Sequence, residues 1–161
     1  MIGSDARSAA PTLRPATPED EPFLRELYRV TRAGEFAALP LAPAQLRALC
    51  DTQFDAQLAG YRAAYCQVQQ FVVASSDEPA GRLIKARDAT SLWLLDIALM
   101  PEFRGRGLGG HLVRALQDEA RTSASPLRLH VEKSNPWLAW YQRLGFVVEG
   151  ASGLHYELKW T

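Results

Sequence analysis

The chain has 161 residues, of which 47% are hydrophobic and 22% are charged, as is usual for a globular protein. Its 18 basic and 18 acidic side chains cancel, so no overall charge favours nucleic acid or an anionic membrane. The N-terminus lacks the apolar core of a signal peptide, and the longest strongly apolar run, Leu92 to Met100, is too short to cross a bilayer. We therefore expect a cytoplasmic protein that binds neither nucleic acid nor membrane, in which any anion site is built locally.

The first part of the chain predicts a strand and two helices. The tetrapeptide Thr17-Pro18-Glu19-Asp20 combines a capping threonine, a proline at the first helical position and acids in the first turn, which is typical of a helix start. In chain order we predict a disordered tail at 1–10, a strand at 12–14, a helix from Thr17 to about Arg32, a loop at 33–43 and a helix from Pro43 to about Tyr65.

After residue 67 the apolar pattern changes to period two and to β-branched and aromatic residues, which favours strands. In chain order we predict strands at 68–74, 81–86 and 92–99, a helix at 107–121, a strand at 126–131, a short helix from Asn135 to Gly145, and strands at 146–148 and 154–160. The strand at 92–99 is apolar on both faces, so it is central. One domain at 11–161 follows, an α/β sandwich whose mixed, mostly antiparallel twisted sheet is flanked by helices. Its unit at 92–131 is parallel and right-handed.

Two cysteines, Cys50 and Cys66, occur without a CxxC or nearby histidine pattern, so we expect no metal site. A disulfide between them stays open, and reduced, buried thiols are the favoured interpretation.

The most informative segment follows the strand at 92–99, where Arg104-Gly105-Arg106-Gly107-Leu108-Gly109 leads directly into a helix. The first N–H groups of a helix lack partners and carry partial positive charge. Glycines allow a phosphate to approach the backbone and permit angles that point N–H groups inward. We interpret the loop as a cradle for a diphosphate, with a plain glycine-rich turn as the alternative. The segment lacks both the Gly-Lys-Ser/Thr of a P-loop and the GxGxxG order of a dinucleotide fold.

These residues resemble the GNAT superfamily of N-acetyltransferases. Its first hallmark, (Arg/Gln)-x-x-Gly-x-(Gly/Ala) after a strand, is matched by Arg104, Gly107 and Gly109. Its second hallmark, an asparagine followed by a helix that ends in Tyr-x-x-x-Gly-Phe, is matched by Asn135 and the segment Tyr141–Phe146. The two motifs occur in the expected order and in the expected secondary structure, which makes the match specific.

The resemblance extends over roughly 68–160 and is only topological over 12–66. It implies an acetyl-CoA-dependent N-acetyltransferase that needs no metal and acts on a primary amine of a small molecule or a protein, as a monomer or homodimer. The resemblance implies that the pantetheine arm contacts the backbone of Ile97, Ala98 and Leu99 and the side chain of Asn135. The pyrophosphate is then bound by the segment Arg104, Gly105, Arg106, Gly107, Leu108 and Gly109.

The resemblance implies that Tyr141 is the general acid that protonates the departing thiolate and also contacts the cofactor. A six-residue interval from Asn135 to Tyr141, where many members have seven, leaves Ser134 as an alternative to Asn135. A non-catalytic acyl-CoA-binding module is the alternative function. The retained Tyr141 favours an enzyme, because binding alone needs no proton donor.

The base that deprotonates the acceptor ammonium stays open. Asp96 is the first candidate, because a lone carboxylate in an apolar strand should hold its proton tightly, be paired, or lie at a bulge that faces a cleft. Glu132, just past a strand end, is the second candidate. His130 is more often structural in such a position, and a water chain is a further possibility.

Overall fold

The computed structural model describes residues 9–161, so most of the tail predicted at 1–10 lies outside the described residues. In chain order the elements are β1 (Thr12–Pro15), the 3₁₀ helix η1 (Pro18–Asp20), α1 (Glu21–Phe36), α2 (Pro43–Ala64), β2 (Gln69–Ser75), β3 (Glu78–Arg87), β4 (Leu92–Leu99), the 3₁₀ helix η2 (Pro101–Phe103), α3 (Leu108–Thr122), β5 (Leu127–Glu132), α4 (Leu138–Arg143), β6 (Val147–Ser152) and β7 (His155–Trp160).

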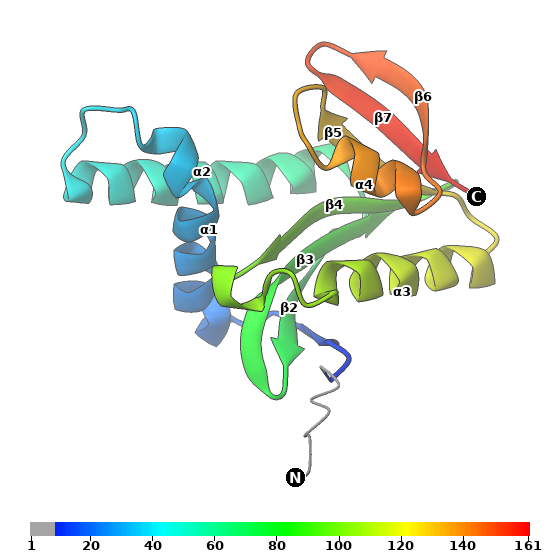
Figure 1. Ribbon diagram of the computed structural model, residues 1–161, viewed down its shortest axis with the longest axis horizontal. Helices are drawn as coiled ribbons and strands as arrows, with labels where there is room; N and C mark the ends of the chain where they lie inside the picture. Colours follow the sequence, from blue (N-terminus) through cyan, green and yellow to red (C-terminus); the bar gives the residue numbers. More distant parts are fainter. Residues whose placement is uncertain (1–8) are drawn as a thin grey trace, which may run out of the picture.

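The strands form one sheet in the order β1-β2-β3-β4-β5-β7-β6 (Figure 1). Within residues 9–161 the β4–β5 pair is parallel and each other neighbouring pair is antiparallel. The predicted mixed, mostly antiparallel sheet with a parallel unit at its centre is therefore confirmed.

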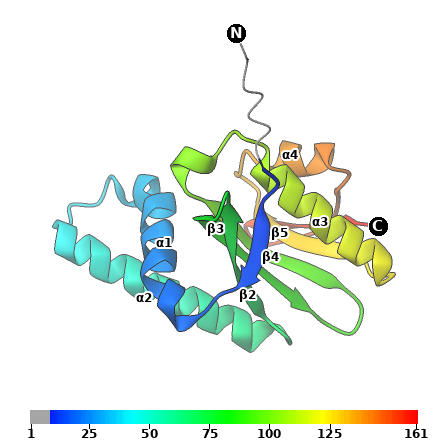
Figure 2. The ribbon, with the colours of Figure 1, turned by 90° about the horizontal axis from the view of Figure 1, so that it is seen from below.

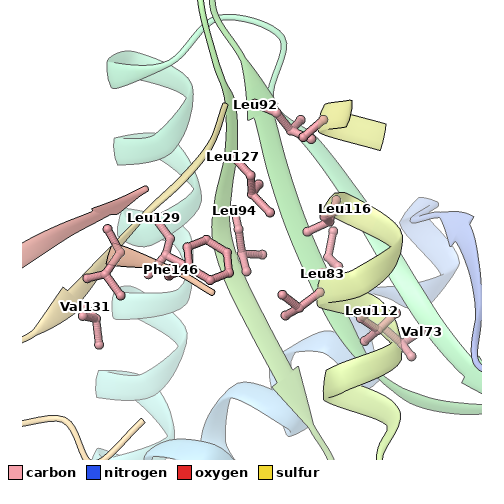
Figure 3. Close-up of a cluster of buried hydrophobic side chains, with 13 residues drawn as sticks. Val73, Leu83, Leu92, Leu94, Leu112, Leu116, Leu127, Leu129, Val131 and Phe146 are labelled. Carbon is pink, nitrogen blue, oxygen red and sulfur yellow. The ribbon is translucent and has the colours of Figure 1, made fainter. Parts of the chain in front are cut away.

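Two helices cover each face of the sheet. Helices α1 and α2 lie on one side and α3 and α4 on the other (Figure 2). The larger core lies under α3, where leucines of β4 and β5 pack against leucines of the helix and against Phe146 (Figure 3). A smaller core joins α1 and α2 to Val72 of β2. Each leucine or phenylalanine buried in this way stabilises the fold by about 1.5–3 kcal/mol.

Helix α1 departs from the prediction at both ends: the turn after Thr17 is the 3₁₀ helix η1, and α1 itself begins at Glu21. Helix α1 continues to Phe36, so the loop expected from residue 33 begins four residues later. Gly34 prompted that expectation, but it lies on the exposed side of the helix, where a glycine weakens a turn without ending it. An ion pair between Arg32 and Glu35 supports the last turn.

Both cysteines are free. Cys50 is buried, as predicted, but Cys66 is exposed, so the prediction of two buried thiols is wrong for Cys66. Cys66 follows the end of α2, where the chain crosses the surface toward β2.

Candidate active site

The site forms where the two central strands separate. Strand β4 pairs with β5 through three residues, ending at Leu94 opposite Leu129, and then continues for five residues without β5 beside it. The gap opens into a cleft of about 690 Å³ that is lined by both strands, by the start of α3 and by parts of α1, α2 and α4. This volume is in the range of small-molecule sites. Of the residues predicted for the site, those lining the cleft are Asp96, Ile97, Ala98, Leu99, Arg104, Gly105, Gly107, Leu108, Gly109, Glu132, Asn135 and Tyr141.

The loop before α3 has the backbone conformation of an anion cradle. Gly105 and Gly107 both have positive φ, +73° and +80°, although a Cβ at either position would meet no atom within 4 Å. Glycine is therefore required there by backbone conformation and not by space. Helix α3 starts directly after Gly107, so the N–H groups of its first turn point toward the loop without intrahelical partners.

The two arginines of the loop lie differently. Arg104 lines the cleft, and its Nε donates a hydrogen bond of 3.0 Å to the carbonyl of Leu99, the last residue of β4. This bond ties the end of the strand to the loop. Arg106 is not among the lining residues, and its guanidinium lies over the ring of Phe103, 5.3 Å from the centroid. The structure thus brings Arg104 into the site and keeps Arg106 at its edge.

A bulge in β4 accounts for the position of Asp96. Leu94 is opposite Lys85 and Asp96 is opposite Ile84, which leaves Leu95 as an extra residue. Before the bulge the even-numbered residues face the α3 core, and after it Ile97 packs there instead. Asp96 is thereby turned to the α2 side. A lone carboxylate in this apolar strand is both paired and beside a bulge, two of the three settings expected for it.

Asp96 forms an ion pair with Arg82 of β3. Nε and Nη2 of the guanidinium donate to Oδ2 of Asp96 at 3.0 and 2.8 Å, and Nη2 also donates to Gln57 of α2 at 2.7 Å. The Arg82 side chain is 3% exposed and that of Asp96 is 20% exposed. The buried cation therefore holds the carboxylate at the cleft wall, and Tyr61 of α2 adds a hydrogen bond of 3.0 Å to the carbonyl of Leu95.

Tyr141 reaches the cleft from α4, packed edge-on against Trp140 and Phe146. Burial raises the pKa of the phenol to about 12, and the negative charge of Asp96 contributes to the same shift. The hydroxyl therefore stays protonated at neutral pH. Within residues 9–161 it has no recorded hydrogen-bond partner, so it is free to donate to a ligand.

Helix α4 begins at Leu138, three residues after the predicted start at Asn135. Before it, Oδ1 of Asn135 accepts the N–H of Trp137 at 2.9 Å, so residues 135–137 form a turn closed by a side chain. Asn135 lines the cleft, and Ser134 is not among the lining residues. Gly145, with φ of +93°, ends the helix as predicted.

Glu132 and His130 line the cleft from β5. Glu132 is exposed at the end of the strand. His130 stacks on Trp93, with ring centroids 5.2 Å apart, and its Nδ1 lies 3.4 Å from the hydroxyl of Tyr65. These contacts agree with a structural role for His130.

Sequence reasoning missed several residues of the site. Arg32, Gln57 and Tyr61 come from α1 and α2, and Trp137 and Trp140 come from the α4 region. No local motif marks the first three, because their positions depend on how the helices pack over the bulge. The two tryptophans lie within the segment from Asn135 to Tyr141. Two tryptophans in so short a segment could have marked them as residues of the site.

The comparison with protein families gives a match to the acetyltransferase (GNAT) domain over residues 67–148. The chain belongs to the GNAT family. A comparison with curated proteins gives no match. The match includes the separated strands, the glycine loop and α4, and it ends before β6 is complete. Helices α1 and α2 lie outside it.

Solved structures show the same fold. An N-acetyltransferase, PaiA, from Thermoplasma acidophilum in complex with coenzyme A is 16% identical, with a TM-score of 0.70 over 93% of this chain and 98% of that one. An acetyltransferase from Thermus thermophilus is 20% identical, with a TM-score of 0.66 over 95% and 97%. A GNAT acetyltransferase from Elizabethkingia anophelis with acetyl-CoA bound is 17% identical, with a TM-score of 0.61 over 94% and 97%. The expected GNAT fold is confirmed.

Across residues 9–161 no group of three or more His, Cys, Asp or Glu side chains is arranged to hold a metal ion. In the same part of the chain, no helix is both long and apolar enough to cross a membrane.

Proposed function

We propose that this GNAT protein transfers the acetyl group of acetyl-CoA to a primary amine, by direct attack within a ternary complex. The observation that carries the proposal is one continuous cleft that joins the start of α3 to the hydroxyl of Tyr141 and the carboxylate of Asp96. We further propose that residues 11–161 form one catalytic domain and that it works in the cytoplasm.

Several features of the cleft fit acetyl-CoA. The N–H groups of Leu108 and Gly109, at a helix start after two glycines of positive φ, suit the pyrophosphate. The edge of β4 from Ile97 to Leu99, which β5 leaves unpaired, suits the amide groups of the pantetheine arm. Asn135 has its side-chain N–H₂ free to bind the same arm, since only Oδ1 is used in the turn.

The reaction forms a C–N bond and breaks the C–S bond of the thioester. The neutral amine attacks the carbonyl carbon, its proton passes to a base, and the sulfur leaves as a thiolate that receives a proton. Tyr141 is the proposed donor to that sulfur, because its phenol is protonated at neutral pH and has no hydrogen-bond partner in the described part of the chain. No acyl-enzyme is required.

Glu132 and Asp96 are the proposed cleft carboxylates for the proton of the amine. Oδ2 of Asp96 accepts two hydrogen bonds from Arg82, which hold this carboxylate in an ion pair. Glu132 has no such partner in the part of the chain that the structure describes. We therefore assign proton removal first to Glu132, directly or through water, and ammonium binding to Asp96.

The test is a transfer assay with the full chain. Acetyl-CoA is mixed with a panel of primary amines, and release of the CoA thiol and formation of the acetylated product are measured together. The proposal predicts equal amounts of both. If CoA binds but neither is formed with any amine, the protein is an acyl-CoA-binding module and the catalytic proposal fails.

A further inference from the structure

The acceptor end of the cleft carries charges of both signs on facing elements. Arg32 and Glu35 reach it from α1, and Gln57 reaches it from α2. Asp96 faces them from β4. An amine that carries a single positive charge would contact only the acidic groups of this surface. The basic and amide side chains therefore indicate what other group the substrate carries.

Asp96 has a free oxygen in the cleft. Both N–H groups that Arg82 gives to Asp96 are bound by Oδ2. Oδ1 has no hydrogen-bond partner among residues 9–161. A carboxylate with one oxygen fixed by a buried cation and the other open to the cleft is an oriented acceptor for the N–H groups of an ammonium ion.

Arg32 and Gln57 offer free donors at the same end. Nη1 of Arg32 binds the carboxylate of Glu35 at 3.1 Å, and the guanidinium lies over Tyr28, 5.1 Å from the ring centroid. Its Nε and Nη2 have no hydrogen-bond partner within the described part of the chain. Oε1 of Gln57 accepts a hydrogen bond from Arg82, which leaves the N–H₂ group of Gln57 to donate. Such donors suit a carboxylate.

Arg32 and Asp96 do not neutralise each other. Each is paired elsewhere, Arg32 with Glu35 and Asp96 with Arg82, and no ion pair joins them among the described residues. They therefore present separate positive and negative positions to one cleft. A bound molecule with an ammonium group and a carboxylate can complement both at once.

We propose that the acceptor is a free amino acid, whose ammonium group binds Asp96 and whose carboxylate binds Arg32 and Gln57. This inference rests on the proposed acetyl transfer and names its substrate class. A polyamine fits less well, because a second ammonium group would meet the guanidinium of Arg32 and would have to displace it from its ion pair with Glu35. A peptide N-terminus fits less well because it leaves the free donors of Arg32 without a carboxylate.

The first experiment uses the wild-type chain and matched substrates. Transfer from acetyl-CoA is measured for free amino acids, for the corresponding amino acid amides, which keep the ammonium group and lose the carboxylate, and for spermidine. We expect kcat/KM to fall about 10- to 100-fold from an acid to its amide, the usual effect of losing a charged hydrogen-bonding group. Equal or better use of the amides or of spermidine would overturn the inference and leave acetyl transfer intact.

The second experiment assigns the discrimination to Arg32. Arg32→Met keeps much of the side-chain length and removes the guanidinium, so it should lower kcat/KM for the acid much more than for the amide. Arg32→Lys, which keeps the charge and loses the planar donors, should fall between the two. Arg62→Met is the matched control, since Arg62 is exposed on α2 and outside the cleft. Equal losses for acid and amide in Arg32→Met, with unchanged thermal unfolding, would contradict the inference. If no amine is acetylated by wild type, the proposed function itself has failed.

Discussion

The two halves of the cleft consist of different kinds of chemical group. The donor half, Arg104–Gly109 with α4, consists of backbone N–H groups, glycines and one phenol. The acceptor half, Arg32, Gln57, Tyr61 and Asp96, consists of side chains held by ion pairs and hydrogen bonds. A cofactor shared by a family demands one backbone geometry, which a short motif can encode. Side chains on helices that recognise an acceptor leave no such motif. The family match accordingly includes the donor half of the cleft and omits α1 and α2.

The largest expected effect is at the donor half. Tyr141→Phe removes the proposed proton donor and should lower kcat about 10²- to 10⁴-fold, the range for general acid catalysis. The KM for acetyl-CoA should change little, because the hydroxyl has no hydrogen-bond partner among residues 9–161 whose loss would disturb the cleft. Steady-state kinetics and CoA binding measure this, with Tyr156→Phe, outside the cleft, as the control. A variant that keeps full kcat would remove Tyr141 from the mechanism.

The next effect tests the backbone of the cradle. Gly107 has φ of +80°, so Gly107→Val places a β-branched residue in a left-handed conformation at a cost of about 1–3 kcal/mol. The loop should shift and raise the KM for acetyl-CoA about tenfold or more, since 1.4 kcal/mol corresponds to a factor of ten. Gly150→Val, on β6 with ordinary φ and open space, is the control. An unchanged KM in Gly107→Val would show that the cradle does not bind the cofactor.

The buried phenols predict a loss of stability at alkaline pH. The pKa of Tyr141 and that of Tyr61 are raised by burial from 10.0 to about 12 in the folded protein. The folded state thus holds these protons more tightly than the unfolded state, so their contribution is complete below pH 10 and is lost as the pH rises toward 12.

Urea unfolding at several pH values between 8 and 11 measures this loss. The decline should be shallower in Tyr141→Phe and in Tyr61→Phe than in wild type. If the Tyr61 variant alone changes the slope, Tyr141 is less buried than the structure shows.

The smallest effect concerns Gly60 of α2, the helix that carries Gln57 and Tyr61 of the acceptor half. Gly60 is exposed within α2, has ordinary φ, and a Cβ there would meet no atom within 4 Å. Gly60→Ala should therefore stabilise the protein by about 0.5–1 kcal/mol, measured by chemical unfolding, with kcat/KM unchanged. A loss of stability would mean that α2 needs flexibility at this point. Together with Gly107→Val, this variant separates a glycine that the fold tolerates from one that it requires.

Local patterns were sufficient for the central elements. The bounds of β4 were predicted as observed, because a continuous apolar run followed by Pro101 determines them. Helix α3 and strand β5 were predicted to within one residue at each end for similar reasons. The start of α4 was placed too early, because an asparagine before a proline can cap a helix or close its own turn, and only the packing of the following residues decides.

The acceptor half lay beyond local reasoning. The sequence marked Asp96 as unusual but gave no partner for it. Arg82 lies in β3, 25 residues along the chain from Gln57 in α2, and the two meet only after the sheet and helices have packed. The bulge that turns Asp96 toward them is an extra residue inside an apolar run. Because Leu95 directly follows another leucine, the sequence does not indicate which residue forms the bulge.

The extra residue Leu95 determines which face of the sheet each later residue of β4 occupies. If Leu95 took a place in the regular alternation instead of forming the bulge, Asp96 would point into the α3 core and Ile97 would point toward α2. Every residue after the bulge depends on this count, whatever its own chemistry. The strand can therefore accept many substitutions, but a change that flattened the bulge while keeping Leu95 would turn Asp96 into the core and Ile97 toward the α2 side.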